Sequence, residues 1–433
     1  MPSSDKLSKE TSILIVGAGV FGLSTALHLS RAGYKEITVI DPHPVPSPLS
    51  AANDINKIIR TEYHIPLYGG LAREAYQAWN HDPLFAHHFH KVGWFTGAAG
   101  DDTRGHEIVA KIWANIKADG VKTNAKQIKC GDDLKKIVSQ TSGSRKLDQW
   151  MGIFNPEAGW AHSGNALIGV ANELRTRGVR FVHGNDGTFE SLHKNSKGVV
   201  DGITASSGRH IPAERVILAM GASTGSRYPV KDMLRAYGYG LAMIQLEPQE
   251  ALLYKNMPCL HSKTLGYIFE PSVDGRLKIA LPGRYAWYGY GDGEASRPEA
   301  PVSSYNNLPP QCIKEMRELL ATFLPQLADR PFCYSQLCWD ADSSDDNFLI
   351  TYAPESERVL FATGGSYHGF KFFPTIGRHV VSALEGTLSE EARLAWRWRP
   401  EIAGQYKTRG DGETRVLERD NPVKPETVRT SRL

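Results

Sequence analysis

The chain has 433 residues, which is too long for one ordinary hydrophobic core and indicates either two domains or one domain with a large insertion. Hydrophobic residues make up 41% and charged residues 22%, so the chain can bury a sizeable core, and intrinsic disorder is excluded. The 50 Lys and Arg residues against 47 Asp and Glu leave a formal net charge of +3, and the basic residues are scattered. This pattern predicts no nucleic-acid surface and favours a protein that acts on small molecules.

Five cysteines are an odd number, and no two of them form a C-x-x-C pair. They are Cys130, Cys259, Cys312, Cys333 and Cys338. This usage argues against both a disulfide framework and a zinc cage, so we expect no metal site and a reducing compartment. Residues 1–11 are polar, and the apolar run Ile13–Val16 is far shorter than the roughly 20 residues of a membrane span. Neither a signal peptide nor membrane association is therefore expected.

Residues 12–41 contain the most regular pattern of the chain. An apolar strand at Ser12–Val16 precedes a glycine-rich turn, a helix extends to about Arg31, and a second strand follows at Ile37–Ile40. This order of elements predicts a βαβ unit.

The turn itself reads Gly17-Ala-Gly19-Val20-Phe21-Gly22, the G-x-G-x-x-G fingerprint of dinucleotide binding. Gly17 makes the tight turn, Gly19 lets the backbone approach a pyrophosphate, and Gly22 lets helix and strand pack closely. We expect the pyrophosphate to lie at the helix N-terminus, against Val20 and Phe21.

Asp41 follows Gly22 by nineteen residues, at the end of the second strand. Its carboxylate is placed to accept hydrogen bonds from a ribose hydroxyl, and its charge would repel a 2′-phosphate. The pattern therefore favours FAD or NAD over NADP. The fingerprint does not distinguish FAD from NAD.

Later segments extend this nucleotide domain with a helix at Asn165–Arg177 and strands at Gly178–Val182 and Glu214–Ala219. Residues 83–150 and 231–330 lack the strand, turn and helix order of the first segment, which indicates a second domain inserted into the first. We expect residues 1–82, 151–230 and 338–433 to bind the nucleotide, and residues 83–150 and 231–337 to bind the substrate. A helix is expected at about Arg378–Leu388, and an irregular tail from Arg409.

Five blocks in order identify the chain more closely. They are Ile13–Gly22 with Asp41-Pro42, Asn53–Arg60, Gly159–His162 with Val216–Gly221, Tyr267–Lys278, and Cys338-Trp339 through Gly364–Lys371. With these blocks the chain resembles the sarcosine oxidase family of flavin amine oxidases, and especially its fungal branch of fructosyl amino acid, saccharopine and pipecolate oxidases. The resemblance implies an α/β fold, with a glutathione-reductase-type FAD-binding Rossmann domain and an inserted mixed-sheet substrate domain.

The resemblance also implies a covalent flavin. Cys338 matches the position that carries FAD as a thioether on its 8α carbon, ahead of an apolar strand that is Phe348–Ile350 here. Considered alone, a cysteine beside Trp339 is more often buried packing. Cys333, five residues earlier, is the alternative attachment site.

Four basic residues and a tyrosine match the family's substrate and oxygen sites. Arg60 and Lys371 match the pair that clamps the substrate carboxylate, for which Arg offers a planar, bidentate fork; without the resemblance, either would be interpreted as a solvated surface charge. Lys278 matches the lysine that promotes oxygen reduction, and Lys57 matches a second basic position on the other side of the flavin. Tyr267 matches a substrate-contacting tyrosine, although an ordinary strand aromatic remains an alternative. The same blocks place Asn53, Gly369 and Phe370 with Lys371 against the cofactor.

Two departures from the family bear on the substrate. Fructosyl amino acid oxidases have an acidic sugar-binding residue four positions after the flavin-edge lysine, and Pro282 stands there in this chain. Bacterial members have a tyrosine two positions after the attachment cysteine, and this chain has Asp340. Asp340 either attracts the substrate ammonium or hydrogen-bonds the backbone.

The resulting prediction is an FAD-dependent oxidase of a secondary L-amino acid, such as pipecolate, saccharopine or an N-methyl amino acid, that uses dioxygen and yields an imine and hydrogen peroxide. The alternatives are a fructosyl amino acid oxidase, an NAD-dependent dehydrogenase and a flavin-binding protein without oxidase activity. The chain ends in Ser431-Arg432-Leu433, a variant of the peroxisomal Ser-Lys-Leu signal, so we expect recognition by the peroxisomal import receptor. The enzyme is expected to be a monomer.

Overall fold

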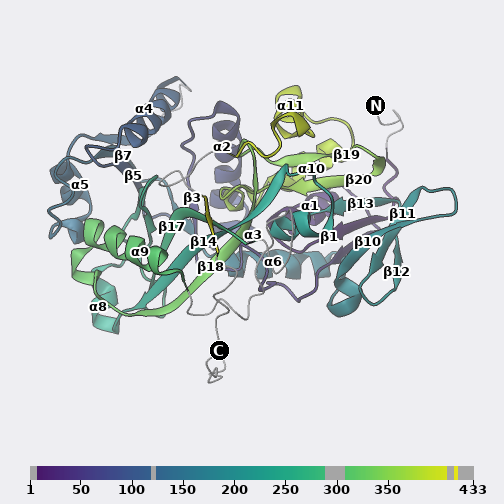
Figure 1. Ribbon diagram of the computed structural model, residues 1–433, viewed down its shortest axis with the longest axis horizontal. Coiled ribbons are helices and arrows are strands. Elements are labelled where there is room, and N and C mark those ends of the chain that lie inside the picture. Colours follow the sequence, from purple (N-terminus) through teal and green to yellow (C-terminus); the bar gives the residue numbers. More distant parts are fainter. Residues whose placement is uncertain (1–6, 119–122, 288–307, 407–413, 418–433) are drawn as a thin grey trace.

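The computed structural model describes residues 7–118, 123–287, 308–406 and 414–417. Its elements form two halves, each built on a large β-sheet (Figure 1). One sheet has six strands and the other has nine, and smaller three-stranded sheets flank them. The predicted α/β class, with a dinucleotide-type sheet and a second mixed sheet, is confirmed.

The six-stranded sheet forms the nucleotide half. Its order is β19-β20-β13-β1-β2-β9, and all neighbours are parallel except β19 and β20. The strands are β1 (Ile13–Val16), β2 (Ile37–Ile40), β9 (Arg180–Val182), β13 (Arg215–Leu218), β19 (Leu349–Ala353) and β20 (Ser356–Thr363). Every side chain of β1 is buried, because helices and loops cover both faces of a parallel sheet.

Helices α1 (Val20–Arg31), α6 (Ser163–Thr176) and α10 (Ile376–Leu384) pack against this sheet through one large hydrophobic core. Gly377 of α10 lies so close to the backbone of Ser24 in α1 that a Cβ would overlap it. Both later helices begin two residues before their predicted starts, and α10 also ends four residues early, at Leu384.

The nine-stranded sheet forms the other half. Its order is β18-β14-β17-β16-β15-β5-β7-β6, with β21 paired to β17. The strands are β5 (Trp94–Ala98), β6 (Lys126–Ile128), β7 (Met151–Asn155), β14 (Leu234–Gln245), β15 (Cys259–Ser262), β16 (Gly266–Ile268), β17 (Arg276–Ala286), β18 (Phe332–Ser343) and β21 (Thr414–Val416). The sheet is mixed, since β5 with β15 and β17 with β21 are parallel and the other pairs are antiparallel.

Two of the expected domain boundaries, at residues 150/151 and 337/338, fall inside this second sheet. Strand β7 begins at residue 151 but pairs with β5 and β6, and β18 runs continuously through residue 338. The expected irregular tail is corrected in one place, because residues 414–416 form β21 beside Arg284–Ala286. An extended segment can pair with unpaired backbone groups of a strand wherever the chain returns to it. Such a pairing depends on the tertiary fold, so the local sequence does not predict it.

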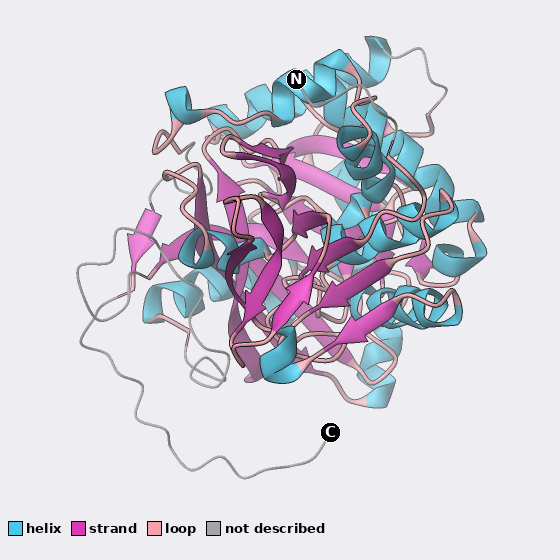
Figure 2. Cartoon of the chain, turned by 90° about the vertical axis from the view of Figure 1, so that its right-hand side faces the viewer, coloured by secondary structure: helices cyan, strands magenta, loops and turns pink. Residues whose placement is uncertain are grey.

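The remaining elements cover these sheets. Figure 2 shows strands through the centre of the molecule and helices along its outside. The remaining helices are α2 (Pro66–His81), α3 (Pro83–Ala86), α4 (Thr103–Ala118), α5 (Gly131–Ile137), α7 (Thr224–Arg227), α8 (Pro248–Leu253), α9 (Pro310–Phe323) and α11 (Glu390–Trp396). The small sheets are β3 (Lys57–Ile59), β8 (Gly159–Ala161) and β4 (Phe89–His90), and β10 (Phe189–Lys194), β11 (Val200–Ala205) and β12 (His210–Pro212). Over the described ranges, no helix is both long and apolar enough to cross a membrane.

Candidate active site

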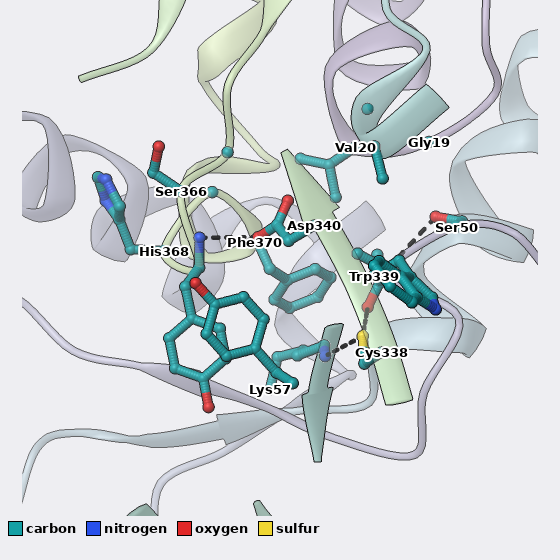
Figure 3. Close-up of a pocket in the computed structure, with 18 of the residues that line it drawn as sticks. Gly19, Val20, Ser50, Lys57, Cys338, Trp339, Asp340, Ser366, His368 and Phe370 are labelled. Carbon is teal, nitrogen blue, oxygen red and sulfur yellow. Dashed lines mark hydrogen bonds between the residues drawn. The ribbon is translucent and has the colours of Figure 1, made fainter. Parts of the chain in front are cut away.

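A cavity of about 470 Å³ is lined by residues of both large sheets. It contains most of the residues that the sequence predicts for the site. These are Gly17, Gly19, Val20, Phe21, Asp41, Lys57, Arg60, Tyr267, Lys278, Cys338, Asp340, Gly369, Phe370 and Lys371. Figure 3 shows part of the wall, where Lys57 points toward Cys338 and Asp340 lies beside Phe370.

The glycine turn fits a bound pyrophosphate. Gly17 has a φ of +108°, and a Cβ there would overlap the carbonyl oxygen of Ala219. A Cβ on Gly22 would overlap the carbonyl oxygen of Gly17, so this glycine serves the packing of helix on strand rather than the cavity wall. Gly19 faces open space, with only Ser50 Oγ near, at 3.5 Å. Helix α1 has no acidic residue in its first turn and no side-chain cap, which leaves its N-terminal N–H groups for a phosphate.

Asp41 lies at the end of β2, as predicted. Its two carboxylate oxygens accept the backbone N–H groups of Ala18 and His43, each at 3.0 Å. Each oxygen keeps a second lone pair and Asp41 lines the cavity, so its carboxylate can accept a further hydrogen bond from a ribose hydroxyl. With the glycine turn, this geometry fits the adenosine end that FAD and NAD share.

Three buried charges meet near the sulfur of Cys338. Asp54 Oδ2 accepts from the ammonium groups of both Lys278 and Lys57, and the Lys57 pair measures 2.9 Å. Lys278 is fully buried and also donates to the carbonyl oxygen of Asn56 at 2.8 Å. Lys57 Nζ lies 4.0 Å from Cys338 Sγ (Figure 3). We call Asp54, Lys57 and Lys278 the lysine–aspartate cluster.

The cluster sets different charge states for its two lysines. Burial lowers the pKa of Lys278 to about 8; the attraction of Asp54 opposes this shift, and the repulsion of Lys57 adds to it. Burial opposes the charge of Lys57 too, but Asp54 prevails and the pKa of Lys57 is raised. The pKa of Asp54 is lowered, since the two lysines outweigh its burial. Lys278 therefore titrates far nearer neutral pH than an ordinary lysine.

Arg60 and Lys371 form a second pair of cations in the cavity, without a carboxylate between them. Both face the ring of Tyr63, with Arg60 Cζ 4.3 Å and Lys371 Nζ 5.4 Å from its centroid. Arg60 Nη1 is buried and has no hydrogen-bond partner among the described residues, and Lys371 donates to the carbonyl oxygen of His368 at 2.9 Å. Burial and then the charges of Arg60 and Lys263 hold the pKa of Lys371 well below its usual value. Lys371 is therefore buried rather than a solvated surface charge, and Arg60 is partly buried in the cavity wall.

Asp340 hydrogen-bonds the backbone, which is one of its two expected roles. Its carboxylate accepts the N–H of Tyr367 at 2.7 Å and that of Ala341 at 2.8 Å. Ser366 and Tyr367 both have positive φ, so Asp340 supports a strained turn that leads to Lys371. Burial, and then repulsion from Asp342, raises the pKa of Asp340 to about 6.

Two cysteines were candidates for the flavin link, and only one lines the cavity. Cys338 lies in its wall, whereas Cys333 is exposed and does not line it. Burial raises the pKa of the Cys338 thiol, while the positive charge of Lys57 opposes that shift. The position of Lys57 thus favours the thiolate of Cys338.

Of the two remaining predicted site residues, Tyr267 and Asn53, only Tyr267 lines the cavity. Burial raises the pKa of the Tyr267 hydroxyl to about 12. Asn53 does not line it; its backbone N–H donates to Ser50, and its side-chain oxygen is near Gly164 at the start of α6. The neighbouring residue Asp54 faces the cavity instead.

Three further residues line the cavity without having been predicted from the sequence: Asp54, His261 and Lys263. Asp54 lies within the matched block 53–60, where a carboxylate three residues before a lysine was a usable signal. His261 hydrogen-bonds Thr96 through Nδ1 at 2.7 Å, and burial with the charges of Lys263 and Arg60 holds its pKa well below the usual value. Neither His261 nor Lys263 belongs to a recognisable motif.

Comparison with known proteins decides the family. Residues 12–383 match the family model described as DAO, FAD dependent oxidoreductase. The chain belongs to this family. The NAD-dependent alternative is thereby excluded, and an FAD-dependent oxidoreductase is confirmed.

Individual relatives agree with this family assignment. This oxidoreductase is 35% identical over 409 residues to L-saccharopine oxidase of Schizosaccharomyces pombe, covering 90% of this chain and 93% of the relative. It is 26% identical over 463 residues to an amino acid oxidase of Aspergillus flavus, covering 86% and 92%. Among solved structures, the fructosamine oxidase Amadoriase II of Aspergillus fumigatus superposes with a TM-score of 0.85 at 34% identity, covering 98% and 99% of the two chains. These relatives confirm the predicted class of FAD-dependent amino acid oxidase.

Proposed function

We propose that this enzyme oxidises the C–N bond of a secondary L-amino acid to an imine and passes the electrons to dioxygen, with hydrogen peroxide as the second product. The observation that carries the proposal is the pair Arg60 and Lys371. Lys371 is buried and Arg60 is partly buried, with its Nη1 shielded from solvent; two such cations that repel each other, with no ion-pair partner among the described residues, are an unfavourable arrangement unless an anion joins them. A substrate carboxylate supplies that anion, and the Arg60 guanidinium can hold it bidentately.

Each group of the site has a distinct task. FAD, when bound, supplies the two-electron chemistry that no side chain provides. Arg60 and Lys371 hold the carboxylate and so fix the position of the adjacent C–H bond. Lys278 presents a fixed positive charge in a dry site, where it stabilises negative charge that develops on oxygen.

The cavity favours an acidic substrate over a sugar adduct. Lys263 and Arg104 line it in addition to the clamp, whereas Pro282 occupies the place of the family's sugar-binding acid. Saccharopine carries more carboxylates than pipecolate or sarcosine and can use these additional cations. The relative named L-saccharopine oxidase supports the same choice.

A peroxide-coupled assay of four compounds tests the substrate class. We expect the highest kcat/KM with saccharopine, followed by pipecolate, sarcosine and then fructosyl-lysine. The variant Lys263→Met is expected to raise the KM for saccharopine more than that for sarcosine. A dominant rate on fructosyl-lysine would instead favour the fructosyl amino acid oxidase alternative, which the structural similarity to Amadoriase II keeps open.

We propose that Cys338 carries FAD as an 8α-thioether. Formation of the C–S bond removes one hydrogen from the thiol and one from the 8α methyl group, and dioxygen, already a substrate, accepts both with two electrons. Acid precipitation of the purified protein should leave the absorbance near 450 nm in the pellet. Cys338→Ala should lose this flavin to the supernatant and Cys333→Ala should retain it; acid-stable flavin in Cys338→Ala would place the link elsewhere.

We also propose a peroxisomal location, because a hydrogen peroxide producer is safest beside catalase. The terminal Ser431-Arg432-Leu433 supports it and lies outside the described residues. A fluorescent fusion that keeps this C-terminus should colocalise with a peroxisomal marker. Deletion of the three residues should abolish that pattern, and import that persists would contradict the proposal.

A further inference from the structure

A cluster of two histidines and an aspartate lies on the small sheet β10-β11-β12, away from the cavity. His193 is on β10, Asp201 on β11 and His210 on β12, and none of them lines the cavity. One nitrogen of each histidine and one oxygen of the aspartate all lie within 4.8 Å of one another. The side chains are about one-third exposed, so solutes can reach them. We call these residues the His–Asp–His cluster.

A β-bulge brings Asp201 into the cluster. On β10 the adjacent residues His193 and Lys194 pair with Gly202 and Val200 of β11, so Asp201 is an extra residue in the ladder. Alternating strand geometry would place Asp201 and Gly202 on opposite faces, and a bulge re-aims the side chain. As a result Asp201 Oδ1 lies 2.6 Å from His193 Nδ1 and 3.7 Å from His210 Nε2.

A glycine lets the two imidazole rings meet. Gly202 lies on the central strand between them, with a φ of +147°, and a Cβ there would come within 2.9 Å of His210 Nε2. Without that side chain the rings of His193 and His210 stack with their centroids 3.8 Å apart. The bulge and the glycine thus act together to gather three donor atoms from three strands.

We propose that the His–Asp–His cluster binds a divalent transition-metal ion, of which zinc is the best match. Two imidazole nitrogens and one carboxylate oxygen are a donor set that zinc accepts. Zinc–ligand bonds of about 2.1 Å in a tetrahedron separate the ligand atoms by about 3.4 Å, a value between the two distances that Asp201 Oδ1 makes. Water completes the tetrahedron on the exposed side.

The ion would join all three strands of the sheet, so its expected effect is on stability. A ligand that binds only the folded state raises the unfolding temperature as its concentration rises. Catalysis should not depend on the ion, because the His–Asp–His cluster does not line the cavity.

The experiment uses the purified full-length holoenzyme, stripped with a chelator and then dialysed against zinc. Metal content is measured by mass spectrometry, affinity by calorimetry, and the unfolding temperature with and without zinc. The variants are His193→Gln and His210→Gln. The matched control is His81→Gln, an exposed histidine in the last turn of α2.

We expect one zinc ion per wild-type chain, a dissociation constant at least tenfold higher in each cluster variant, and no change in His81→Gln. Zinc should raise the unfolding temperature of the wild type and of His81→Gln but not that of the cluster variants. Equal zinc binding by wild type and both cluster variants would place the metal on other histidines and overturn the proposal. Absence of stoichiometric binding to the wild type would do the same.

Discussion

The cavity contains two pairs of cations that differ in one respect. Lys57 and Lys278 share the carboxylate of Asp54, whereas no carboxylate of the described residues forms an ion pair with Arg60 or Lys371. Loss of hydration is costly for all four charges, whether they are fully or partly buried, and the protein offsets that cost with its own aspartate in only one pair. The compensated pair is complete without a substrate. The uncompensated pair would be stabilised by an anion from outside, which is why we propose it as the binding site of the substrate carboxylate.

The largest expected effect, on the free energy of unfolding, comes from removing the carboxylate of Asp54. Asp54→Asn leaves two buried ammonium groups without their counter-charge, so we expect a loss of about 3–5 kcal/mol in the free energy of unfolding. Denaturant unfolding of the purified protein measures it. The double variant Asp54→Asn/Lys278→Met should recover part of the loss, because one uncompensated charge is gone. A double variant no more stable than the single one would show that Asp54 contributes by packing rather than by charge.

The next effect concerns the uncompensated pair. Arg60→Ala should lower kcat/KM for the amino acid by about 10²–10³, since truncation of one buried charge partner typically costs 2–5 kcal/mol. The rate on the decarboxylated amine provides the control and should change little. Lys371→Met should show the same selective loss. An equal loss on amino acid and amine in both variants would assign these residues to folding or flavin binding.

Lys278 provides a third test, on the compensated side. Lys278→Met should slow the reoxidation of reduced enzyme by dioxygen about a hundredfold and affect anaerobic reduction by substrate much less, because its charge acts on oxygen. Stopped-flow measurement of the two half-reactions separates these effects. Comparable losses in both steps would make Lys278 a structural residue of the lysine–aspartate cluster.

The sequence could predict those parts of the site whose residues lie close together in the chain. The glycine turn and Asp41 lie within one βαβ unit, so local spacing predicted their roles and the structure places them accordingly. Arg60, Lys278, Cys338 and Lys371 come from separate segments, and only the resemblance to a family brought them together in advance. Pairings created by the fold had no such signal. The ion pair of Asp54 with Lys278 and the pairing of strand β21 with β17 depend on contacts between residues far apart in the chain.

A pH profile gives the smallest effect and the sharpest comparison of the two lysines that share Asp54. In the proposed role of Lys278 the cationic form acts on oxygen, and burial lowers its pKa to about 8, so the charge is lost as pH rises through 8. The protonated fraction falls from about 0.9 at pH 7 to about 0.1 at pH 9, and the reoxidation rate should fall about tenfold. Lys57, whose pKa is raised, keeps its charge throughout this range and therefore adds no pH dependence to the reoxidation rate between pH 7 and 9. Lys278→Met should therefore give a slow and flat profile between pH 7 and 9. A wild-type profile that is equally flat would mean that Asp54 holds the proton on Lys278 more strongly than its burial opposes it.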